Sequence, residues 1–408
     1  MSTRTMSRSE RPARRTHRGE AARKQATPKA RGASSDGRGT YLLLLGVIAV
    51  LVIIGVVMVL SASSVLSVTS YGSAWYFFQR QLIWTLIAVI TFAVIVHIDY
   101  HRWASVVRPL LAATTVLLVA VLVPGVGVYV GGSRRWLGIG AWRFQPSELA
   151  KLAVLLFAAD LLTRRADELH DTRRVLRPLL LVLGMVAALV VLEPDLDSTV
   201  LLALIVGALM VAGGITARHL ALLCGTGVAL SAFLAVAAPY RRARVLTFLH
   251  PTADASNAGY QIVQSLIALG TGGVSGVGLG AGRSKWLFLP NAHTDFIFSI
   301  IGEELGLVGT LSVLGLFVAF AALGIRTAQR APDRFGMLLA VGVTVWVVAQ
   351  AAVNIGGVIG LLPVSGIPLP FVSFGGSSLV FTMVAAGILA NVARQGSQAK
   401  SHAPSPAR

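Results

Sequence analysis

Long apolar runs recur along most of this chain, and they constrain its fold more than any other feature of the sequence. Each run approaches the roughly 20 residues that an α-helix needs to cross the hydrocarbon core of a bilayer. Because backbone groups in lipid must hydrogen-bond within their own segment, we expect these runs to be helices. The predicted spans are residues 41–62, 80–98, 106–124, 147–163, 178–193, 197–213, 219–238, 296–325, 336–359 and 373–393. The predicted fold class is therefore an all-α integral membrane protein with ten transmembrane helices.

The few charges of the chain are unevenly placed. Charged residues make up 13% of the sequence and the net charge is +18, whereas a soluble domain carries roughly 25% charged residues. The segment 1–40 is basic, rich in small and polar residues and without an apolar period, which predicts a disordered tail rather than a cleaved signal peptide. The positive-inside rule predicts that this tail is cytoplasmic, and an even number of spans returns the C-terminal tail to the same side. We expect a basic tail at 1–40, a membrane domain at 41–393 and a second cytoplasmic tail at 394–408.

The N-terminal tail could in principle bind nucleic acid, but we favour a topology anchor near anionic lipid and predict no nucleic-acid partner. Two loops on the predicted outer face, near 125–146 and at 239–294, do not obey the positive-inside bias of the other loops. Their basic residues are Arg134, Arg135, Arg143, Arg241, Arg242, Arg244, Arg283 and Lys285. Because guanidinium groups bind phosphate and carboxylate oxygens well, these loops indicate an anionic ligand at the outer face.

Three loop segments have their own patterns. The spacing of apolar residues in Ala258–Leu269 predicts a short interfacial helix. The glycine-rich stretch Gly270–Gly282 lacks the spacing of a phosphate-binding loop, and we interpret it as a flexible connection. The segment Gly360–Ser378 contains three prolines and cannot be a regular helix, so it is either a surface loop or a segment that lines a cavity at membrane depth.

Ionisable residues in or beside membrane spans are candidates for function. Glu148 and Lys151 share a helix face at the start of the fourth expected span, as a structural ion pair or as part of a site. Asp295 lies at the outer end of the eighth, where it is either an N-cap or a catalytic carboxylate. Glu303 and Glu304 lie about two turns deeper and could pair with Lys151 or hold helices together. Asp197 or Ser198 is expected to cap the sixth span.

Thiol chemistry is limited in this chain because Cys224 is its single cysteine. An intrachain disulfide and a zinc site built on several thiolates are therefore excluded. No motif with the spacing of metal ligands is evident, so the metal content is left open.

Several motifs in a fixed order resemble the SEDS family, whose members act in shape, elongation, division and sporulation. They are Gly132-Ser133-Arg134-Arg135-Trp136, Gln145-Pro146-Ser147-Glu148, Glu193-Pro194-Asp195, Tyr240-Arg241-Arg242-Ala243-Arg244, Ala292-His293-Thr294-Asp295-Phe296-Ile297-Phe298 and Phe374-Gly375-Gly376-Ser377-Ser378. The resemblance runs from about Tyr41 to Val392. The stretch Ile301-Gly302-Glu303-Glu304-Leu305-Gly306 looks more like the division members than the elongation members. Asp197 and Phe374 depart from the commonest pattern, which has glycine and tyrosine there.

This resemblance implies a ten-helix bundle with a large extracellular loop between helices 7 and 8. It implies that the chain is a peptidoglycan glycosyltransferase that polymerises lipid II. It also implies that the chain works with a class B penicillin-binding protein and other divisome proteins, in the plasma membrane at the division septum. The family's catalytic carboxylate corresponds to Asp295. Candidate substrate-binding residues are Arg134, Arg135, Trp136, Glu148, Lys151, Arg244 and His293. A divalent cation at the pyrophosphate is compatible with this chemistry.

Two other functions fit parts of the same pattern. A lipid II flippase would use the same anionic substrate, although we see no inverted repeat in the sequence. A scaffold without catalysis would suit the basic tail and broken loops, but it gives Asp295 no purpose. The polymerase therefore remains the preferred prediction.

Overall fold

The computed structural model describes residues 29–130, 133–140, 142–169, 171–216, 218–221, 223, 225–227, 229, 242, 246–249 and 259–402. The expected span 219–238 and loop 239–258 fall largely outside these residues, as do residues 1–28 of the tail. The helices before the loop are α1 (Lys29–Tyr71), α2 (Tyr76–His97), α3 (Trp103–Leu122), α4 (Pro146–Arg164), α5 (Arg177–Leu192) and α6 (Leu196–Ala212). Those after it are α9 (Tyr260–Gly272), α10 (Ile297–Gln329), α11 (Arg334–Val358) and α12 (Gly376–His402). Short helical turns cover Tyr100–Arg102, Ala166–Glu168 and Thr172–Leu176.

Seven of the described helices are long and apolar enough to cross a membrane: Arg38–Tyr71, Tyr76–His97, Tyr100–Leu122, Thr172–Leu192, Ile297–Gln329, Arg334–Val358 and Gly376–Gln398. The protein is therefore a mostly helical, multi-pass membrane protein. The expected spans at 147–163 and 197–213 correspond to α4 and α6. α4 carries more charge than the seven, and α6 is shorter. The count of ten remains a prediction.

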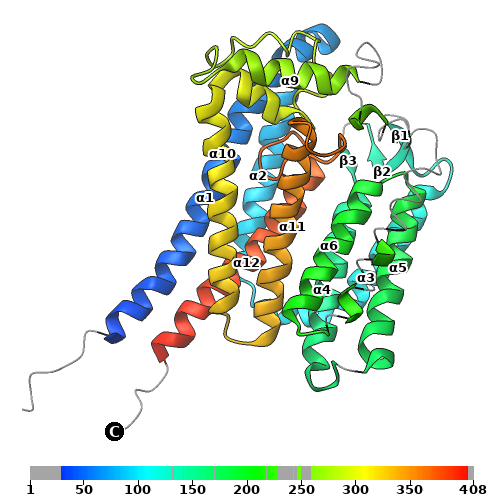
Figure 1. The fold of residues 1–408 in the computed structure, drawn as a ribbon, viewed down its shortest axis with the longest axis vertical. Coiled ribbons are helices and arrows are strands. Elements are labelled where there is room, and N and C mark those ends of the chain that lie inside the picture. The colour runs from blue at the N-terminus through cyan, green and yellow to red at the C-terminus, as the bar shows by residue number, and fades with distance from the viewer. Residues whose placement is uncertain are drawn as a thin grey trace, which may run out of the picture.

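The bundle has a buried centre and an apolar outer surface. Most residues of α4 are buried, and α11 and α12 are also largely enclosed. Large aliphatic side chains face outward from the peripheral helices, as Ile53, Leu86 and Val116 illustrate. A helix that is apolar on every face is typical of the core of a membrane bundle. Figure 1 shows that α1 begins and α12 ends at the same end of the molecule, whereas α9 and the strands lie at the other end.

A small antiparallel sheet occupies the loop near 125–146, which corrects the all-α expectation. Its strands are β1 (Val128–Val130), β2 (Ser133–Ile139) and β3 (Trp142–Phe144), in the order β1-β2-β3. Val128 is paired with Trp136, and Leu137 with Phe144. Aromatic and β-branched residues between glycines favour such hairpins, but strands this short give a weak signal in a sequence dominated by spans. The sheet continues directly into α4, which begins at Pro146.

The expected termini of several elements also differ. α1 begins at Lys29, so the part of the predicted disordered tail after residue 28 is helical, and α12 continues beyond 393 to His402. The cap of α6 is Asp195, whose carboxylate accepts a hydrogen bond from the amide of Ser198 at 3.1 Å. Asp197 instead accepts a bond from the amide of Gly366 at 3.1 Å. The prediction that Asp197 or Ser198 caps α6 was therefore wrong by two or three positions.

The glycine-rich stretch before α10, which we expected to be a flexible connection, is held to α10 by backbone hydrogen bonds. α10 is broken at Gly306, where φ is +66°. The carbonyls of Glu303 and Glu304 accept hydrogen bonds from the amides of Val277 and Gly278 at 3.0 and 3.1 Å. In return, the amides of Leu307 and Val308 donate to the carbonyls of Gly273 and Val274 at 3.0 and 3.2 Å. The segment 273–278 thus satisfies the backbone groups that the break releases.

Candidate active site

Asp295 lies two residues before Ile297, the first residue of α10. α10 begins at the end of the molecule that carries α9 and the sheet (Figure 1). The helix begins at Ile297, and its N-cap position is taken by Phe296, which makes no side-chain cap bond. Asp295 therefore precedes the cap position by one residue. Its side chain is only partly buried, so it lies at the border between the packed core and the surface.

The backbone on which Asp295 lies is fixed at three consecutive carbonyls. The carbonyl of His293 accepts a hydrogen bond from the amide of Phe374 at 2.9 Å. The carbonyl of Thr294 accepts from Ser373 Oγ at 2.6 Å. The carbonyl of Asp295 accepts from Asn354 Nδ2 at 2.8 Å. Two donors come from the segment 361–375 and one from α11, so distant parts of the chain hold the aspartate's peptide.

The proline-rich segment 361–375 is itself packed into the bundle. Ile367, Leu369, Phe371 and Val372 are all buried. The carbonyl of Pro368 accepts a hydrogen bond from Gln350 Nε2 at 3.0 Å. Of the two interpretations left open by the composition, the structure therefore favours a segment covered by protein over a plain surface loop.

Glu148 and Lys151 form a buried ion pair at the centre of the bundle. Lys151 Nζ lies 2.9 Å from Glu148 Oε1 and 2.9 Å from Gln350 Oε1, and the lysine side chain is fully buried. The indole of Trp346 covers this ammonium at 5.1 Å and also donates to Gln350 Oε1 at 3.0 Å. The shared helix face was thus predicted correctly, and Gln350 links the pair to the carbonyl of Pro368.

Of the two alternatives for Glu303 and Glu304, the pairing with Lys151 was wrong, whereas the bond from Ser61 of α1 to Glu304 agrees with a role in holding helices together. Glu304 instead pairs with Lys285, whose Nζ lies 2.9 Å from Glu304 Oε1. Glu303 Oε1 accepts from the amides of Arg283 and Ser284 at 2.7 and 3.2 Å. Lys285 is consequently a buried partner of the broken helix and does not belong to the cationic surface that the sequence indicated.

The arginines of the sheet have different environments. Arg134 is exposed on β2, and Trp136 is partly buried on the same strand. Arg135 donates from Nε to the carbonyl of Glu193 at 3.0 Å and from Nη2 to the carbonyl of Pro194. The sheet is therefore tied to the turn between α5 and α6. Arg241 and Arg244 lie outside the described residues.

The turn after α5 contains an enclosed carboxyl group. Glu193 is 1% exposed, and neither of its carboxylate oxygens has a hydrogen-bond partner among the described residues. Burial, with the neighbouring Asp195 charge, raises the pKa of Glu193 to about 8, although Arg135 opposes the shift. Asp195 differs because Gln145, Ser147 and Ser198 all donate to it. The motifs around 145, 193 and 197 thus meet at the start of α6.

His293 is enclosed by aromatic rings. Its ring centroid lies 4.7 Å from that of Phe77 and 5.5 Å from that of Phe374. Burial lowers the pKa of His293 to about 4, so the imidazole is neutral near pH 7. Its packing indicates that it supports the loop before α10 through contact and through its carbonyl.

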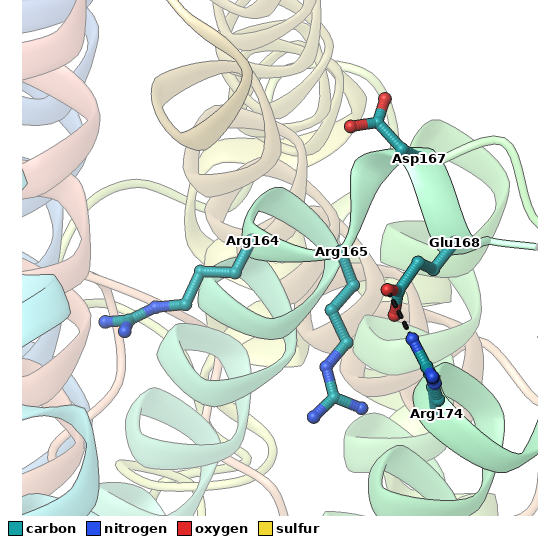
Figure 2. A pocket seen from close by; sticks show the side chains of 5 residues that line it. All are labelled: Arg164, Arg165, Asp167, Glu168 and Arg174. Carbon is teal, nitrogen blue, oxygen red and sulfur yellow. Dashed lines mark hydrogen bonds and ion pairs between the residues drawn. The ribbon is translucent and has the colours of Figure 1, made fainter.

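A cavity of about 480 Å³ lies away from Asp295, at the other end of α4. It is lined by Arg164, Arg165, Asp167, Glu168 and Arg174 (Figure 2). Glu168 and Arg174 form an ion pair at 2.7 Å across it, and Arg164 pairs with Asp160 at 2.7 Å. Much of its charge is internally compensated, so we do not assign it to the chemistry.

The sequence interpretation missed three polar residues that shape the site: Gln350, Asn354 and Ser373. Gln350 and Asn354 are four residues apart inside an apolar span, which is the signal that could have identified them. No group of three or more His, Cys, Asp and Glu residues able to hold a metal ion is found within the described part of the chain.

The model of the cell cycle protein family of FtsW, RodA and SpoVE matches residues 41–398. The chain belongs to this family. Among relatives, a Mycobacterium tuberculosis protein named "Probable peptidoglycan glycosyltransferase FtsW" is 43% identical over 355 residues, which cover 87% of this chain and 68% of the relative. Stage V sporulation protein E of Bacillus subtilis is 41% identical over 325 residues, which cover 79% of this chain and 88% of the relative.

Solved structures of the FtsW, RodA and SpoVE family share the fold. A chain from a study of how a peptidoglycan synthase complex coordinates polymerisation and crosslinking matches with a TM-score of 0.72 and 29% identity. The match covers 86% of this chain and 97% of the other. The rod shape determining protein RodA of Thermus thermophilus matches with a TM-score of 0.64 and 28% identity, over 86% of this chain and 96% of that protein.

Proposed function

We propose that this chain is a peptidoglycan glycosyltransferase that polymerises lipid II, with Asp295 as the general base. The observation that carries this proposal is the position of one partly buried aspartate, held at the mouth of α10 in a member of this family. Relatives named as peptidoglycan glycosyltransferases support the activity. The geometry supports the role because Asp295 lies beside the cap position of its helix and not at it.

The reaction joins the 4-hydroxyl of one lipid II to the anomeric carbon of another. Asp295 accepts the hydroxyl proton while the oxygen bonds to that carbon. The bond from the carbon to the pyrophosphate oxygen breaks, and polyprenyl pyrophosphate leaves with the electron pair. The α-linked donor becomes a β-linked product, so one displacement with one base is sufficient. The carboxyl pair of a glycoside hydrolase is not needed, because pyrophosphate leaves without protonation.

The leaving group requires positive charge at the same end of the molecule. We propose that Arg134, Arg135 and Arg244 receive the pyrophosphate, with Trp136 beside them on β2. The exposed guanidinium of Arg134 supports this role. Glu148 and Lys151 would act from the interior, through Gln350 and the segment 361–375. A divalent cation would enter as a counter-ion of the pyrophosphate.

The topology and partners follow from the same proposal. α1 begins and α12 ends at the same end of the molecule (Figure 1), which supports cytoplasmic termini. We propose a ten-helix bundle with Asp295 on the outer side. We propose that the chain works with a class B penicillin-binding protein and other divisome proteins at the septum. Its relatives named FtsW support the division role over elongation.

The decisive experiment compares wild type with Asp295→Asn, using the purified full chain, a class B penicillin-binding protein and labelled lipid II. We expect the variant to lose about 10²–10⁴-fold in polymerisation, the usual contribution of a general base. Asp160→Asn is a matched control, because Asp160 pairs with Arg164 at the other end of α4. Polymerisation by Asp295→Asn at the wild-type rate would contradict the catalytic assignment. A wild-type protein that moves lipid II across vesicles without making polymer would favour the flippase.

A further inference from the structure

Asn354 occupies a distinctive place in the hydrogen bonding around Asp295. It lies on α11, four residues after Gln350, and is 2% exposed. Its two amide hydrogens go to two different segments: Nδ2 donates to the carbonyl of Asp295 at 2.8 Å and to the carbonyl of Ile367 at 2.8 Å. One side chain therefore joins the aspartate's own peptide, the segment 361–375 and a buried helix.

The other two donors to this loop do not lie on a helix. Ser373 and Phe374, which hold the carbonyls of Thr294 and His293, both belong to the segment 361–375. They keep the two segments together, and the segment 361–375 is itself tied to α11 by the hydrogen bond from Gln350 to the carbonyl of Pro368. Asn354 is the donor that bonds the carbonyl of Asp295 directly to α11, a largely buried helix.

The bonded carbonyl belongs to Asp295 itself. A hydrogen bond to this oxygen restricts rotation of the peptide that follows the aspartate's Cα, and so limits where the carboxylate can point. The contact does not reach the carboxylate, so it changes the direction of the base rather than its charge. Misplacement of a reacting group by about 1 Å can cost 10²-fold in rate.

We infer that Asn354 is a positioning residue that aligns Asp295 for proton abstraction by fixing its backbone carbonyl to α11. The inference rests on the proposed function for its catalytic meaning. The hydrogen bonds themselves are independent of it and can be tested separately. Asn354 acts through Asp295 and is not itself a catalytic residue.

Asn354→Leu tests the inference because leucine has nearly the same size and no donor. In the full chain with its partner, we expect kcat for lipid II polymerisation to fall about 10–100-fold. KM should change by no more than about twofold, because the variant leaves in place the arginines proposed to receive the pyrophosphate. In an Asp295→Asn background the same change should have little further effect on the residual rate, because the aligned base is already absent.

Asn391→Leu is the matched control. Asn391 is fully buried on α12 and donates to the carbonyl of Val96 at 2.7 Å, near the end of the bundle away from Asp295. Its loss should lower thermal stability by a comparable amount but leave kcat per folded molecule unchanged. If Asn391→Leu lowers kcat as much as Asn354→Leu, the effect is general destabilisation and the inference is wrong.

Hydrogen exchange separates failure of the inference from failure of the proposed function. Asn354→Leu should speed amide exchange in residues 291–298 and 365–375, whereas Asn391→Leu should not. Unchanged exchange there in Asn354→Leu would overturn the inference even if wild type makes no polymer. An inactive wild type with the expected exchange pattern would instead refute the polymerase proposal and leave the positioning contact standing.

Discussion

Replacing Lys285 with methionine should destabilise the protein strongly, because the ammonium is the charged partner of a fully buried carboxylate. Lys285 Nζ donates to Glu304 Oε1 at 2.9 Å, to Ser61 Oγ at 3.1 Å and to the carbonyl of Gly280 at 2.6 Å. Of the described contacts, only the hydrogen bond from the hydroxyl of Ser61 to the Glu304 carboxylate remains in the variant. Removal of one partner of a buried ion pair costs about 3–5 kcal/mol, since the remaining charge is uncompensated.

Thermal unfolding in detergent, followed by tryptophan fluorescence, measures this loss. At about 2–4 °C per kcal/mol, the midpoint should fall by roughly 6–20 °C. Arg283→Met is the control, because the side chain of Arg283 is exposed on the same segment and its change should be nearly silent. The double variant Lys285→Met with Glu304→Met should recover much of the stability, since it removes both charges. A Lys285→Met variant with the unfolding midpoint of wild type would refute the buried pair. So would a double variant whose loss of stability equals the sum of two large losses in the single variants, because the two charges would then not be coupled.

Two further predictions concern the same end of the molecule. Gly276→Ala should destabilise by several kcal/mol, because Gly276 has φ +79° and a Cβ there would collide with the carbonyl of Glu304. Gly280→Ala, at φ +81° with open space around it, should cost only about 1–3 kcal/mol for the backbone conformation; equal melting points for the two variants would contradict the close approach. The pKa of His293 is lowered from 6.5 to about 4, so its neutral ring contributes stability that is complete above pH 6.5 and is lost as pH falls through 4. This contribution is about 3 kcal/mol. As the pH is lowered from 7 to 4, the unfolding midpoint should therefore fall less in His293→Phe than in wild type. Parallel falls would show that the acid sensitivity comes from other groups.

The sequence predicted the helices better than the contacts between them. The spans at 147–163 and 197–213 coincide with α4 and α6 nearly to the residue. This success has a simple physical basis, because the length of an apolar run is a local property that the bilayer selects. The first span was predicted to end at 62, whereas α1 continues to Tyr71. Polar serines and a threonine near this end lower the hydropathy without stopping the helix.

The ion pairs illustrate where sequence reasoning stops. The spacing of Glu148 and Lys151 identified a shared face, and these residues do pair. Spacing does not reveal which of several cations lies near Glu304, because this depends on how the preceding segment folds back on α10. Lys285 was assigned to an exposed loop for that reason. Asn354 was missed because the sequence interpretation weighed the ionisable residues of the spans and passed over the neutral amides of Gln350 and Asn354, although their four-residue spacing places both on one helix face.

The break in α10 has a consequence for how the protein enters the membrane. Four backbone groups at residues 303, 304, 307 and 308 depend on partners at 273–278, which are made earlier during synthesis. Each of these groups would cost several kcal/mol if it entered lipid without a partner. α10 should therefore leave the translocon together with the segment that precedes it, as one unit. Membrane insertion of this region should thus depend on the number of residues between 278 and 303. Even a few residues added there would delay the entry of α10, which Asp295 precedes, into the membrane.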